Sequence, residues 1–102
     1  GNGGTGPVIT PGGFYPILRV TPLYPASCAA REVEGQVTVQ YDVTNGGVVV
    51  NAMVVDSTDG CLDRAALRAI EGWKYSPLLE ADPDGIQESG LTQTFEFELE
   101  DS

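Results

Sequence analysis

The chain has 102 residues, enough for one small domain that buries only about two thirds of its unfolded surface. Fifteen acidic residues face five basic ones, and the formal net charge of -10 excludes nucleic acid as a partner, because binding to phosphates depends on Lys and Arg. The same charge disfavours an acidic membrane surface, and no apolar run approaches the roughly 20 residues of a membrane-spanning helix. A peptide, a protein or a basic ligand remains as the class of partner.

The first 13 residues are dominated by Gly and Pro, and Val8 and Ile9 are their main apolar content. Such a composition cannot supply a hydrophobic core and is typical of a flexible linker. We therefore expect residues 1–13 to be a linker and residues 14–102 to form one domain.

The segment from residue 14 to 20 is more apolar and could form a short extended piece. Pro16 and Pro22 would place such a piece at a sheet edge or leave it unpaired, because proline has no backbone N–H to donate. Whether it joins the sheet is left open. Pro25 suits the first turn of a helix, so a short helix is predicted over residues 26–32.

A β-hairpin is predicted from residue 37 to 55. Apolar and polar residues alternate along its first half, which indicates a strand with one buried face. The apolar positions are Val37, Val39, Tyr41 and Val43. Asn45-Gly46-Gly47 tolerates the positive φ angles of hairpin turns, and the β-branched run over residues 48–55 predicts the returning strand.

A second helix and a third strand complete the predicted elements. Residues 57–60 offer N-cap candidates, and apolar residues then recur at helical spacing until Pro77 prevents continuation. The apolar positions of this helix are Leu62, Ala65, Ala66, Ala69, Ile70 and Trp73. Residues 80–90 are interpreted as a polar loop. Residues 91–100 alternate again, with Leu91, Phe95, Phe97 and Leu99 on one side and Thr92, Thr94, Glu96, Glu98 and Glu100 on the other.

This order of elements predicts an α+β fold, a two-layer sandwich in which two helices cover one face of a three-stranded antiparallel sheet. Trp73 and Tyr75, at the end of the second helix, are expected to anchor the core rather than to contact a partner.

The two cysteines, Cys28 and Cys61, match no redox or zinc spacing. The favoured interpretation is a disulfide between them and an oxidising compartment; the alternative is two separate buried thiols in a reducing cytosol. The chain has no His, which disfavours a metal site and removes Ser-His and Cys-His nucleophile pairs. We expect no metal and no cofactor. Asp56, Asp59 and Asp63 are close enough for acid–base chemistry, but helix capping explains them without an enzyme.

Four sequence segments carry a resemblance to a known family. Pro22-Leu23-Tyr24-Pro25 followed by Glu34-Gly35-Gln36-Val37 resembles its P-x-Y-P…E-G-x-V opening. Residues 41–48 resemble its hairpin, Trp73-Lys74-Tyr75-Ser76-Pro77 resembles its W-[KR]-Y-x-P helix end, and the last strand is similarly rich in Phe. The four segments occur in the right order over about residues 16–100. The chain is thus identified as a member of the TonB C-terminal domain family.

The resemblance implies a non-enzymatic periplasmic domain of an energy transducer. In that family an N-terminal helix, which would lie outside these residues, anchors the protein in the inner membrane beside ExbB and ExbD. The C-terminal domain binds the TonB box, an extended segment of outer-membrane receptors, and so helps the receptors to import substrates. The last strand of the family's domain pairs with this segment by strand addition.

Carried over to this sequence, the resemblance implies that the receptor segment is bound by the last strand and by the segment before the first helix. The expected partner-binding residues are Thr21, Pro22, Tyr24, Leu91, Thr92, Gln93, Thr94, Phe95, Glu96, Phe97, Glu98 and Leu99. Many members have Gln where this chain has Thr21, so that contact is not carried over unchanged. The strong acidity is also unusual for the family.

Two further possibilities stay open. The domain could belong to a membrane sensor or peptidase that uses a TonB-like interaction domain outside transport. An unpaired edge strand could also pair with a second copy, so a homodimer is possible.

Overall fold

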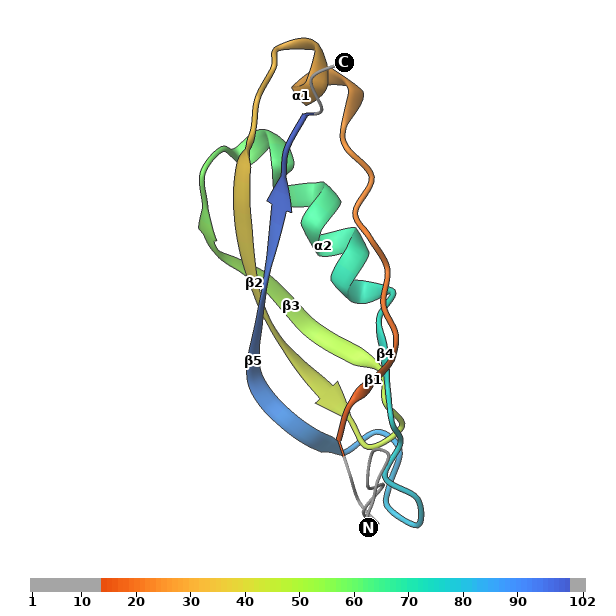
Figure 1. Cartoon of the computed structure of the whole chain (residues 1–102). Helices are drawn as coiled ribbons and strands as arrows, with labels where there is room; N and C mark the ends of the chain where they lie inside the picture. The colour runs from red at the N-terminus through yellow and green to blue at the C-terminus, as the bar shows by residue number, and fades with distance from the viewer. Residues whose placement is uncertain (1–13, 100–102) are drawn as a thin grey trace, which may run out of the picture.

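A computed structural model describes residues 14–99 and shows an α+β fold. The predicted linker over residues 1–13 and the predicted strand residue Glu100 lie outside the described residues. Three long strands form an antiparallel sheet in the order β3-β2-β5, with β2 (Gly35–Thr44) between β3 (Val49–Ser57) and β5 (Ile86–Phe97). The helix α2 (Asp63–Glu71) lies against one face of this sheet, and the shorter helix α1 (Ala26–Ala30) lies at one end of the molecule (Figure 1). The predicted class, three antiparallel strands with two helices, is confirmed.

The central strand β2 has the alternation that the sequence predicts. Val37, Val39, Tyr41 and Val43 are all buried, and they face the apolar stripe of α2. Within that stripe Leu62, Ala66, Ala69, Ile70 and Trp73 are buried, whereas Ala65 is only half-buried. From β5, Phe95 and Phe97 complete the core, so the predicted buried face is confirmed as far as Phe97, where the strand ends; Glu98 and Leu99, predicted to belong to the strand, follow its end.

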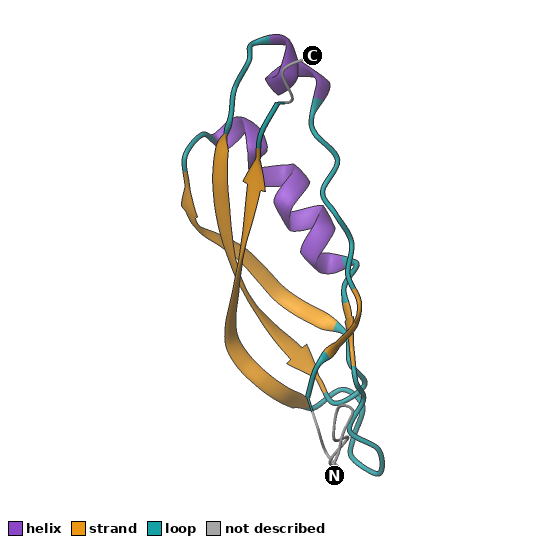
Figure 2. Ribbon diagram, in the orientation of Figure 1, coloured by secondary structure: helices purple, strands orange, loops and turns teal. Residues whose placement is uncertain are grey.

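The structure contains a second sheet of two strands, which answers the open question whether the segment over residues 14–20 pairs with the large sheet. The strand β1 (Pro16–Leu18) pairs antiparallel with β4 (Lys74–Tyr75), not with an edge of the large sheet (Figure 2). Phe14 stacks on Tyr75 with a distance of 4.7 Å between ring centroids. In the core the Tyr75 hydroxyl lies 2.6 Å from that of Tyr41. These ring contacts hold the N-terminal segment against the domain.

The predicted boundaries of three elements need correction. The returning strand of the hairpin, β3, continues to Ser57 and does not end at residue 55. The first helix ends at Ala30 and not at residue 32, because Glu32 has a φ of 57° that no helix accommodates. The last strand begins at Ile86, inside the segment interpreted as a loop. Gly90 does not end a loop: it has a φ of 70° and lies beside a shift in the β2–β5 register, which is a β-bulge within the strand.

Asp42, on the central strand, forms a hydrogen bond with an irregular position on each of the two outer strands. Its carboxylate accepts a hydrogen bond from the Gly90 backbone N–H on β5 (3.0 Å) and another from the Asn51 side-chain amide on β3 (2.9 Å). Asn51 has a φ of 56° next to a register shift of its own. These two hydrogen bonds lower the pKa of Asp42. One carboxylate on the central strand therefore stabilises a bulge on each neighbour.

The disulfide between Cys28 and Cys61 is confirmed. The bond joins α1 to a single 3₁₀ turn, η1 (Gly60–Leu62), that precedes α2, and the two Cα atoms lie 6.0 Å apart. Since α1 is only five residues long, this covalent bond fixes its place at the end of the sheet.

Candidate partner-binding groove

The last strand, β5, is an edge of the large sheet. It pairs with β2 on one side, from Gly35 opposite Phe97 to Thr44 opposite Ile86. Within residues 14–99, no strand pairs with its other side. Along such an edge every second residue directs its N–H and C=O away from the sheet, where another extended chain can pair with them.

Beside this free edge runs an extended segment, residues 19–25, which belongs to no helix or strand. Pro22 and Pro25 fix their own φ angles and push Thr21 and Tyr24, the residues before them, toward extended conformations. The local sequence thus explains why this segment forms neither helix nor ladder.

Two anchors hold the segment in place. At one end the Trp73 indole N–H donates a hydrogen bond of 3.0 Å to the Val20 carbonyl. At the other end the Tyr24 ring meets the Phe97 ring edge-on at 5.6 Å, and its hydroxyl donates to the Val33 carbonyl. Burial and the nearby Glu34 carboxylate raise the pKa of Tyr24, so the hydroxyl keeps its proton as a donor.

A groove of about 460 Å³ lies between the segment and β5. Its lining residues come from three places in the sequence: Arg19, Val20, Thr21, Pro22 and Tyr24 from the segment, Trp73 from the end of α2, and Gln93, Thr94, Phe95, Glu96, Phe97 and Glu98 from β5. The structure thus brings together nine of the residues that the sequence predicts for partner binding. Leu91, Thr92 and Leu99 do not line the groove, although Leu91 and Thr92 continue along β5.

Sequence reasoning missed three contributors to this groove, Arg19, Val20 and Trp73. Arg19 lies over the Trp73 ring, 5.6 Å from its centroid, in a cation–π contact that no local pattern announces. Trp73 is buried, as expected of a core anchor, yet it also lines the groove. One end of the groove therefore carries a cation, and the β5 side carries the carboxylates of Glu96 and Glu98.

Two of the three acidic residues considered for catalysis, Asp59 and Asp63, have structural roles. The Asp59 side chain accepts from the backbone N–H of Cys61 at 2.8 Å and so caps η1. Asp63 accepts a hydrogen bond from the Ser57 hydroxyl in the first turn of α2. Within residues 14–99, no group of three His, Cys, Asp or Glu side chains is placed to hold a metal ion, and no helix has the length and hydropathy of a membrane-spanning segment.

Comparisons with known proteins agree with this architecture. A sequence model of the family described as Gram-negative bacterial TonB protein C-terminal matches residues 20–99. Protein TonB of Klebsiella pneumoniae is 32% identical over 93 residues, covering 90% of this chain and 35% of that protein. Protein TonB of Pseudomonas aeruginosa is 27% identical over 97% of this chain and 30% of its own length. The chain thus spans about a third of the length of these relatives.

Two solved structures have the same fold. The solution structure of the Pseudomonas aeruginosa TonB C-terminal domain matches with a TM-score of 0.69 and 26% identity, over 87% of this chain and 89% of that one. The TonB2 protein of Vibrio anguillarum matches with a TM-score of 0.63 and 33% identity, over 84% and 81% of the two chains.

Proposed function

Because the chain belongs to the family of Gram-negative bacterial TonB C-terminal domains, we propose that it is the periplasmic receptor-binding part of a TonB-type energy transducer. Residues 14–102 are the domain in this proposal, and residues 1–13 are the linker that leads to it. An N-terminal helix outside these residues anchors the protein in the inner membrane and works with ExbB and ExbD.

The proposed mechanism of binding is strand addition to β5. The observation that carries it is the free edge of β5 beside an anchored extended segment, with a groove of about 460 Å³ between them. A TonB box, as an extended receptor segment, satisfies the unpaired N–H and C=O groups of that edge. Because the pairing uses backbone atoms, it accepts many sequences, and one transducer serves several receptors.

Such a contact suits the transmission of force. A pull along the strand axis loads the ladder hydrogen bonds together, whereas peeling breaks them one after another. Tyr24 and Trp73 hold the opposite wall to the core, so the groove keeps its shape under load.

An NMR titration of the isotope-labelled domain with TonB-box peptides from receptors of the same organism tests this proposal. We expect saturable amide shifts over residues 91–98 and 19–24, and much weaker shifts with a control peptide whose central residue is replaced by proline. The other edge strand, β3, is an internal control, because it lies across the sheet from the groove. No shifts at millimolar peptide, or shifts centred on β3, would refute the proposal and favour a sensor or peptidase domain.

Pairing of β5 with a second copy is measured separately. Sedimentation without peptide over a range of protein concentrations shows whether the domain self-associates, and competition by the peptide shows whether the same edge is used.

A further inference from the structure

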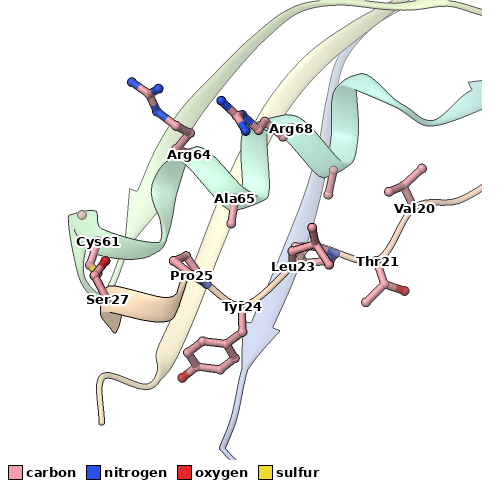
Figure 3. Close-up of a pocket in the computed structure, with 13 residues that line it drawn as sticks. Val20, Thr21, Leu23, Tyr24, Pro25, Ser27, Cys61, Arg64, Ala65 and Arg68 are labelled. Atoms are coloured by element: carbon pink, nitrogen blue, oxygen red, sulfur yellow. The ribbon is translucent and has the colours of Figure 1, made fainter. Parts of the chain in front are cut away.

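A second groove lies on the other side of the extended segment, between that segment and α2. Its volume is about 570 Å³, and residues 20–25 form one wall (Figure 3). The opposite wall consists of Gly60, Cys61 and the α2 residues Arg64, Ala65, Arg68 and Ala69. The groove beside β5 and this second groove therefore share the extended segment as a common wall.

The charge of this second groove differs from that of the chain as a whole. The chain has 15 acidic and five basic residues, yet the lining contains two of the five basic residues, Arg64 and Arg68, and no acidic residue. Both arginines line the groove and are exposed, and in Figure 3 they extend from the same side of α2, with their guanidinium groups directed away from the extended segment. Within residues 14–99, neither guanidinium forms an ion pair or a hydrogen bond. They are an unneutralised pair of cations on an acidic domain.

The rest of the second groove is mostly apolar, with polar side chains at Thr21 and Ser27, and the segment beside it has backbone groups without partners within residues 14–99. Leu23 is 85% exposed, and Ala65 points from α2 toward the segment that carries it (Figure 3). The backbone N–H groups of Thr21, Leu23 and Tyr24 have no hydrogen-bond partner within the described residues. A peptide has carbonyl acceptors along its whole length and can pair with several of these groups, whereas an anionic detergent or fatty acid has acceptors only in its head group.

We propose that this second groove binds an extended peptide segment of a partner protein in which two carboxylates alternate with apolar side chains. Arg64 and Arg68 are four residues apart on a helix, which separates them by about 6 Å along its axis. Two glutamates in a Glu-x-Glu stretch of extended chain are about 6.6 Å apart on the same face. Each guanidinium can therefore pair with one carboxylate, while the neighbouring apolar side chains contact Leu23 and Val20.

The net charge decides against other anionic partners. At -10 the domain as a whole repels a nucleic acid or an anionic membrane, which presents many charges over a wide area. A short segment with two carboxylates meets only the local positive charge of the groove. The proposal does not rest on receptor binding at β5, since it uses the opposite side of the extended segment.

The test uses a blocked peptide with the sequence Ser-Leu-Glu-Leu-Glu-Leu-Ser and its counterpart with Gln at both Glu positions. In NMR titrations we expect the Glu peptide to shift the side-chain Nε–H signals of Arg64 and Arg68 and the amides of residues 20–24, with binding weakened by salt. The Gln peptide and the variant Arg64→Gln/Arg68→Gln should each weaken binding about tenfold. Arg31→Gln, which removes an exposed arginine outside the groove, is the matched control and should leave the affinity unchanged.

Several outcomes would overturn the proposal. These are an absence of saturable shifts at Arg64 and Arg68 in a folded domain, equal binding of the Gln peptide, or equal loss in Arg31→Gln. Glu-dependent shifts confined to residues 91–98 would place the peptide at β5 and likewise contradict it. If the domain dimerises without peptide and Arg64→Gln/Arg68→Gln abolishes the dimer, the occupant is a second copy. A TonB-box peptide that fails at β5 leaves the result at Arg64 and Arg68 untouched, so the two proposals fail separately.

Discussion

Reduction of the Cys28–Cys61 disulfide is expected to lower the free energy of unfolding by about 4 kcal/mol. The bond joins residues separated by 33 positions. In the chain-entropy model, closing a loop of that length removes about 13 cal/mol/K of entropy from the unfolded chain, which is about 4 kcal/mol at 25 °C. Since 1 kcal/mol corresponds to about 4–8 °C in a domain of this size, the Tm should fall by roughly 15–30 °C.

Urea unfolding with and without a reductant, followed by the fluorescence of Trp73, measures this difference. Trp73 is the only tryptophan and is buried, so its emission reports on the core. Because the bond restricts the unfolded chain, reduction should also increase the m-value. The variant Cys28→Ala/Cys61→Ala is the control, since the reductant should not change its stability. A loss below about 1 kcal/mol with an unchanged m-value would refute the reasoning, because the unfolded chain would then gain little freedom.

Three further predictions concern single contacts. Gly47→Ala should destabilise the domain by about 2–3 kcal/mol, because Gly47 has a φ of 87° and an added Cβ would lie 2.1 Å from the Tyr75 carbonyl oxygen. In urea unfolding, Gly46→Ala is its control and should cost less than about 1 kcal/mol, since its Cβ would meet only ordinary contacts at 3.5 Å or more. Tyr75→Phe should lower the free energy of unfolding by about 1–3 kcal/mol, because it leaves the buried Tyr41 hydroxyl without its hydrogen-bond partner. The double variant Tyr41→Phe/Tyr75→Phe should recover part of that loss. A double variant whose loss of stability equals the sum of the two single losses would contradict this. Hydrogen bonds lower the pKa of Asp42 in the folded domain. Its ionised carboxylate therefore stabilises the domain fully above the unfolded pKa of about 3.9, and this stabilisation is lost as the pH falls through the lower pKa of the folded state. Stability measured at pH 7 and at pH 3 should therefore differ less in Asp42→Asn than in the unchanged domain, and an equal difference would show that Asp42 contributes nothing.

The parts of the fold that the sequence predicted are those governed by local periodicity. Alternation over residues 37–43, an Asn-Gly-Gly turn and an apolar stripe from Leu62 to Trp73 each depend on neighbours a few positions away. The β4 strand has two residues, which is too short for any period to show, and its pairing with β1 was accordingly not predicted. Gly90 looked like the end of a loop because a bulge and a turn use the same residue at positive φ.

Strand order was harder to predict because it is a non-local property. The alternation of Phe95 and Phe97 shows that the last strand has one buried face, but it does not show which neighbour the strand pairs with. Had β5 paired with β3, it would still be an edge strand, but on the other side of the sheet and away from the extended segment. Only the register from Gly35 opposite Phe97 onward places β5 beside β2, with its outer edge facing Thr21 and Tyr24. The partner-binding prediction therefore came from the resemblance and not from the pattern.

The second groove could not be predicted from the sequence for a related reason. Arg64 and Arg68 look like ordinary solvent-exposed positions of an amphipathic helix, and nothing near them in sequence is apolar and exposed. Leu23, which lies across the groove, is about 40 positions away, and Pro22 and Pro25 keep it out of any helix or sheet. The segment that carries Leu23 is anchored by the Trp73–Val20 and Tyr24–Val33 hydrogen bonds, and neither involves the disulfide. Reduction should therefore lower stability without opening the groove beside β5, whose lining includes neither cysteine, as long as the domain remains folded.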